Sequence, residues 1–78
     1  MENTAKTYQT GDLYLAAFLK ARGMRLKDKL KYGSKYVFVF DDCHDRKELI
    51  GEFFNDGTVS ISAFKNALQD LKTLVYNV

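Results

Sequence analysis

The segment Tyr36-Val37-Phe38-Val39-Phe40 constrains the fold more than any other part of the sequence. All five residues are aromatic or β-branched, and these residue types are enriched in β-strands. Successive side chains of a strand point to opposite faces, so both faces of this strand are apolar. The sequence therefore predicts a strand over residues 36–40 that helices cover on one face and that a further element or a partner covers on the other.

A second strand precedes it, and its charges alternate with apolar residues. The apolar residues Met24, Leu26, Leu30 and Tyr32 alternate with Arg25, Lys27, Lys29 and Lys31, and only Asp28 breaks the apolar register. Such alternation predicts a half-buried strand with its cations on one face, and the lysines suit a strand at the edge of a sheet. Gly33 and Ser34 supply turn chemistry, so the two strands are expected to form an antiparallel hairpin.

Helix signals flank the hairpin. Thr10 and Asp12 precede the apolar run 13–19, and either can be the N-cap of a helix over about 12–22. Gly23 follows the run and fits the left-handed residue after the last turn. A second helix is expected over about 44–55, with Asp42 or Cys43 as its cap. A capping box of Asp45 and Glu48 is the alternative and would start this helix a turn later.

A third helix is predicted to begin after Ser60, because apolar residues follow with 3-4-3-4 spacing. They are Ile61, Phe64, Leu68, Leu71 and Val75. Gly51, inside the second helix, is expected to mark a close approach to another helix.

These elements predict a small single α+β domain of order α-β-β-α-α, an antiparallel β-hairpin covered by three helices. Residues 1–9 are expected to form a flexible N-terminal segment, and residues 10–78 the domain. With 78 residues, 46% of them apolar, the chain can build one core. Because two strands alone are marginal, a third strand from Thr58 and Val59 or from another chain is plausible.

Several classes of function are excluded by what the chain lacks. One Cys and one His cannot supply a structural zinc site or an internal disulfide. The segment 41–45 contains three Asp, Cys43 and His44, but adjacent residues rarely point at one ion, so acids that cap a helix are the expected role. We expect no enzyme activity, cofactor, metal or small-molecule substrate.

No apolar run could span a bilayer and the first residues are polar, so we expect a cytoplasmic protein without membrane contact.

The net charge of +2 hides two unlike halves. Residues 1–40 hold eight basic and three acidic residues, whereas residues 41–78 hold four basic and seven acidic ones. A candidate polyanion-binding face consists of Arg25, Lys27, Lys29, Lys31 and Lys35.

Our leading hypothesis is a non-enzymatic module that binds a protein partner or a second copy of itself through the hairpin. The alternative is a nucleic-acid-binding module that uses the basic face, and an edge strand kept soluble by its lysines explains the same charges.

The segments Thr10–Leu19 and Tyr36–Asp42, with Phe53–Asn55 and Phe64–Leu68, resemble a family of small bacterial and phage proteins, a domain of unknown function. The resemblance extends from about residue 10 to 76. It implies a compact stand-alone domain, and it implies no functional residues, because the shared motifs are helix faces, a strand and caps.

Overall fold

The computed structural model describes residues 6–55 and 57–76, and it contains three strands and three helices. In chain order they are β1 (Thr7–Thr10), α1 (Leu13–Ala21), β2 (Leu26–Tyr32), β3 (Lys35–Asp41), α2 (Arg46–Phe54) and α3 (Ile61–Tyr76). The predicted α+β class, the hairpin and the three helices are confirmed. The predicted order α-β-β-α-α has to be corrected, because the described chain begins with a short strand.

The three strands form one antiparallel sheet in the order β1-β3-β2, so the apolar strand β3 is central. The third strand is β1, and Thr58 and Val59, the predicted alternative, lie outside any strand. Residues 7–9 belong to β1 although the sequence assigned them to a flexible segment, and residues 1–5 of that segment lie outside the described residues. The two threonines and Tyr8 of β1 are good strand formers, but four residues without an aliphatic side chain give a weak signal.

Helix α1 begins and ends as the sequence predicts. The Asp12 carboxylate accepts hydrogen bonds from the backbone N–H groups of Tyr14 and Leu15, at 3.0 and 3.1 Å. At the other end Gly23 has φ of 104°, and the N–H groups of Gly23 and Met24 donate to carbonyls of the last turn. This pattern is a Schellman motif, in which a glycine takes the left-handed conformation that other residues avoid.

Helix α2 starts later than the predicted residue 44. Its N-cap is Asp45, the residue of the alternative prediction, and not Asp42 or Cys43. The Asp45 side chain makes no capping hydrogen bond, so the predicted capping box does not form. The Asp42 carboxylate instead accepts hydrogen bonds from the Arg46 guanidinium at 3.1 and 3.2 Å. Helix α3 begins as predicted, since Ser60 accepts a hydrogen bond from the N–H of Ala63.

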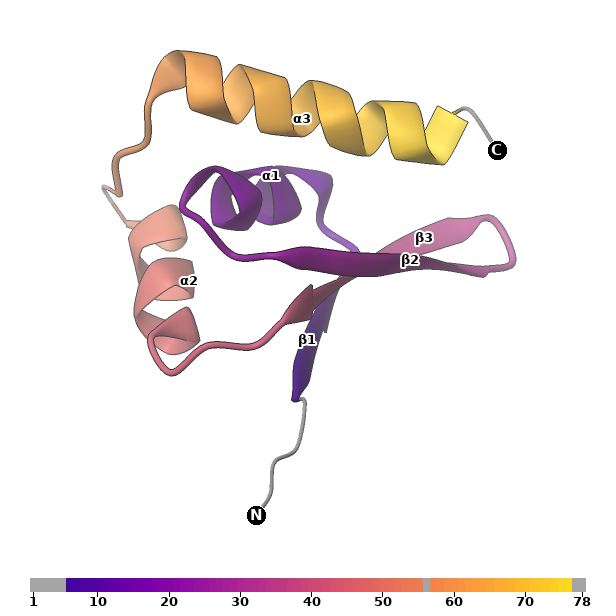
Figure 1. Cartoon of the computed structure of the whole chain (residues 1–78), viewed down its shortest axis with the longest axis horizontal. Coiled ribbons are helices and arrows are strands. Elements are labelled where there is room, and N and C mark those ends of the chain that lie inside the picture. Colours follow the sequence, from indigo (N-terminus) through magenta and orange to yellow (C-terminus); the bar gives the residue numbers. More distant parts are fainter. Residues whose placement is uncertain (1–5, 56, 77–78) are drawn as a thin grey trace.

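The core lies between the helices and one face of the sheet. Phe40, Leu19 and Leu71, from β3, α1 and α3, are its largest fully buried side chains. The ring of Phe53 in α2 lies 5.5 Å from that of Phe18 in α1 and closes the core on a second side. Figure 1 shows α1 and α3 stacked on the same side of the hairpin β2–β3. The opposite side of the sheet carries no described helix.

Candidate functional site

The sheet face that points away from α1 and α3 carries a second group of apolar side chains. Cross-strand partners in a sheet share a face, and Phe38 and Phe40 point into the core. Val37 and Val39 therefore point the other way, together with Leu30, which pairs with Val37. We call this surface the open face. It consists of Thr7, Gln9, Asp28, Leu30, Tyr32, Lys35, Val37, Val39 and Asp41.

The apolar centre of the open face is separate from the core. Val39 is 7% exposed, yet it does not join the hydrophobic cluster between sheet and helices. Its position on the central strand between Gln9 and Asp28 explains this burial, because neighbours flank it on both sides. Val37 and Leu30 are half-buried, and Tyr32 beside them is 59% exposed. One apolar face of β3 thus belongs to the core, and the other forms the centre of the open face.

The two ends of the open face carry opposite charges. Lys35 lies at the hairpin end of β3 and Asp41 at the other end, about 20 Å away for six residues of extended chain. Asp28 lies on the same half of the face as Asp41, since it pairs with Val39. The Arg25 guanidinium is 4.0 Å from the Asp41 carboxylate and is well exposed, so it neutralises Asp41 weakly.

The five predicted cations do not share one face of the sheet. Leu26 pairs with Phe40 and Asp28 with Val39, so β2 holds an extra residue at Lys27. This β-bulge reverses the facing of every residue after it. Lys29 and Lys31, opposite Phe38 and Tyr36, therefore lie on the helix side of the sheet. Arg25 and Lys35 lie on the open side.

Lys29 and Lys31 both lie close to the ring of Tyr36. Each ammonium nitrogen lies 5.6 Å from the ring centroid, within the range of a cation–π contact. The Lys29 ammonium also donates a hydrogen bond to the backbone oxygen of Leu74, in the last turn of α3. Lys29 is thus partly committed to holding α3 against the sheet.

The segment between β3 and α2 contains the thiol and carboxylates that the sequence grouped together. A hydrogen bond with Asp45, together with burial, raises the pKa of the Cys43 thiol. The Arg46 guanidinium lowers the pKa of the Asp42 carboxyl. A raised thiol pKa reduces the thiolate fraction, which is the reactive form. Both the hydrogen bond and the burial therefore oppose ionisation of the Cys43 thiol.

Within residues 6–55 and 57–76, no group of three or more His, Cys, Asp or Glu side chains could hold a metal ion. Among the described helices, none is long and apolar enough to cross a membrane.

Sequence reasoning missed the polar border of the open face and the bulge that defines it. Thr7 and Gln9 belong to this border through β1. The one signal for the bulge in the sequence is Asp28, which interrupts the alternation of β2. In the structure, the residues from Asp28 onward point to the opposite faces from those that strict alternation predicts.

A sequence profile of a domain of unknown function (DUF5659) matches residues 5–77. No curated protein and no solved structure matches the chain. The predicted relation to a domain family of unknown function is thereby confirmed, while the bacterial or phage origin stays a prediction. Because the matched segment spans nearly the whole sequence, the chain belongs to the DUF5659 family.

Proposed function

We propose that this protein is a non-enzymatic binding module whose open face associates with a second copy of itself. The observation that carries the proposal is the apolar stripe of Leu30, Val37 and Val39, which lies on the sheet face away from the core. Apolar side chains gain free energy when an interface removes them from water. The module acts in the cytoplasm of a bacterial or phage-infected cell, where a lone thiol such as Cys43 stays reduced.

The charges of the open face favour a second copy over an unrelated partner. Stacked sheets keep their strands within about 30° of each other. Consider a two-fold axis that lies in the plane between the two sheets, runs across the strands and passes between Val37 and Val39. This axis sets Lys35 of each copy against Asp41 of the other. The same axis brings Tyr32 of one copy near Arg25 of the other, a cation–π pair. The two ends of the open face are therefore complementary across the axis, as an isologous dimer requires, while Asp28 of one copy comes opposite Leu30 of the other.

The area of the open face predicts a weak dimer. Three strands about 4.8 Å apart and about 20 Å long cover roughly 300 Å². A stable interface buries about 800 Å² per partner. Light scattering over a concentration series up to about 1 mM tests the proposal. The average mass should rise from the 9.0 kDa of the monomer towards twice that value. A constant monomer mass over the whole series would refute self-association.

Nucleic-acid binding through Arg25, Lys27, Lys29, Lys31 and Lys35 stays the second hypothesis. The bulge at Lys27 distributes these cations over both faces, which weakens the case for one continuous track for phosphates. Titration with single-stranded and duplex oligonucleotides at two salt concentrations tests this alternative. Binding that weakens steeply with salt supports it, and absence of binding at low salt removes it.

A further inference from the structure

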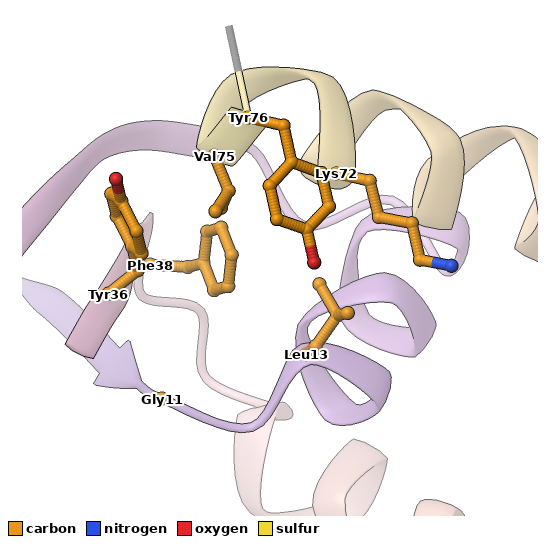
Figure 2. A pocket seen from close by; sticks show the side chains of 7 residues that line it. All are labelled: Gly11, Leu13, Tyr36, Phe38, Lys72, Val75 and Tyr76. Carbon is orange, nitrogen blue, oxygen red and sulfur yellow. The ribbon is translucent and has the colours of Figure 1, made fainter. Parts of the chain in front are cut away.

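A small pocket opens where the end of α3 meets the start of α1 and strand β3, on the helix side of the sheet. Its volume is about 150 Å³. Figure 2 shows the side chains of Phe38 and Val75 between the rings of Tyr36 and Tyr76, and the side chain of Leu13 below the Tyr76 ring. The pocket thus has an apolar floor and two aromatic walls, and it is separate from the open face.

The size of the pocket suits one aromatic ring. Apolar cavities of comparable volume in other proteins take up benzene. Aromatic rings pack favourably at an angle to one another, and Tyr36, Phe38 and Tyr76 offer such contacts. Larger ligands exceed this volume, because drug-sized molecules occupy sites of at least about 300 Å³. One ring, with a short substituent that reaches the solvent, is the ligand that fits.

One basic side chain lies on the rim of the pocket. Lys72 lines it, and in Figure 2 its side chain leads away from the apolar floor. The ammonium of Lys31 lies 5.6 Å from the ring centroid of Tyr36, but Lys31 does not line the pocket. Among the described residues, neither Lys31 nor Lys72 takes part in an ion pair. The positive charge of Lys72 is therefore available to a substituent at the mouth of the pocket.

Two negative groups of the described residues near the pocket are engaged in hydrogen bonds. The Asp12 carboxylate, next in sequence to Leu13, accepts hydrogen bonds from the first N–H groups of α1. The carbonyl end of α3 has partial negative charge, and the Lys29 ammonium donates to its Leu74 oxygen. These contacts reduce the repulsion that an anion would meet at the mouth of the pocket.

We propose that this pocket binds a small aromatic carboxylate. The ring lies on Leu13, Phe38 and Val75 between the two tyrosines, and the carboxylate lies at the mouth of the pocket on the side of Lys72. This site is independent of self-association through the open face, which lies on the other side of the sheet.

Titration of ¹⁵N-labelled protein with phenylacetate, followed by the amide signals in two-dimensional NMR spectra, tests the site. At about 50 μM protein the weak dimer is sparsely populated, so a failure here leaves the dimer proposal standing. We expect saturable shifts at Leu13, Tyr36, Phe38 and Val75, with a dissociation constant in the roughly millimolar range for so small a ligand. Phenylacetamide and acetate serve as the neutral and the non-aromatic controls, and both should bind at least about threefold more weakly.

Two variants locate the ligand. Lys72→Met should weaken phenylacetate binding about threefold or more and leave phenylacetamide binding unchanged, since it removes charge and keeps the apolar stem. Lys65→Met, also on α3 but not lining the pocket, is the matched control and should bind as the wild type does. The proposal is refuted if phenylacetate causes no saturable shifts, if acetate reproduces them, or if Lys72→Met binds phenylacetate like the wild type.

Discussion

The Lys29 ammonium on strand β2 donates a hydrogen bond to the backbone oxygen of Leu74 in the last turn of α3. The two residues are 45 positions apart in the sequence, so this bond joins the edge of the sheet to the C-terminal helix. The last carbonyls of a helix have no partner within the helix. A lysine at this end satisfies one of them and also complements the helix dipole.

Removing this bond should destabilise the fold. Lys29→Met keeps the apolar stem but leaves the Leu74 carbonyl without its donor, and we expect the free energy of unfolding to fall by about 1 kcal/mol. Urea denaturation followed by circular dichroism measures the change. Lys27→Met is the matched control, because Lys27 is exposed at the bulge, and it should change stability far less. Equal losses in both variants would contradict the role of Lys29.

The glycines of α2 and of the connection after it should respond in opposite directions to alanine. A Cβ on Gly51 would have no neighbour within 4 Å, so the predicted close approach to another helix is wrong. Gly51→Ala should therefore raise the free energy of unfolding by about 0.5–1 kcal/mol, through better helix propensity. A Cβ on Gly57 would overlap the backbone carbonyl of Glu52. Gly57→Ala should destabilise by about 1–3 kcal/mol, and thermal unfolding compares the two variants.

The ion pair of Asp42 and Arg46 should make stability depend on acid pH. Since the Arg46 guanidinium lowers the pKa of Asp42, the ionised carboxylate stabilises the fold above the unfolded-state pKa of about 3.9. That contribution is lost as the pH falls through the lowered pKa. Asp42→Asn should therefore unfold at a lower temperature than the wild type at pH 7, with the difference shrinking towards pH 2.

Asp70→Asn provides the control for this pH series. Its carboxylate lies 3.7 Å from the Lys20 ammonium, in a largely exposed ion pair of the kind that contributes little to stability. We expect its unfolding temperature at pH 7 to stay near that of the wild type. A gap between wild type and Asp42→Asn that stays constant from pH 7 to pH 2 would rule out the linkage.

The Cys43 thiol should react slowly with alkylating reagents. Its hydrogen bond with Asp45 and its burial raise its pKa, so little thiolate is present at pH 8. Asp45→Ala removes both the acceptor and its negative charge, and we expect faster reaction with iodoacetamide. Wild-type protein that already reacts as fast as a free cysteine peptide would instead point to an activated thiol.

The sequence predicted the elements that depend on local chemistry. The caps at Asp12 and Ser60 and the left-handed Gly23 were found because each is specified by a few adjacent residues. Strand β3 was predicted correctly because residues 36–40 are all aromatic or β-branched, which favours a strand. One of its apolar faces packs in the core, and the other lies on the open face.

Features that depend on pairing between distant segments were missed or misplaced. Strand β1 is held by its partners on β3, and its own four residues predict little. The bulge at Lys27 is set by the register between β2 and β3, so strict alternation placed Lys29 and Lys31 together with Arg25 on one face. The pocket between Tyr36 and Tyr76 joins residues 40 positions apart, and no local pattern indicates it.

Charge reversal across the open face tests the proposed dimer most directly. We expect the average mass in light scattering at about 1 mM to fall towards that of the monomer for Lys35→Glu and for Asp41→Lys, because each places like charges against each other. The double variant should recover the wild-type mass, since the pair is restored with its charges exchanged. Lys65→Glu, with the same change in net charge as Lys35→Glu, should leave the mass unchanged. Single variants that associate like the wild type, or a double variant that stays monomeric, would contradict the account.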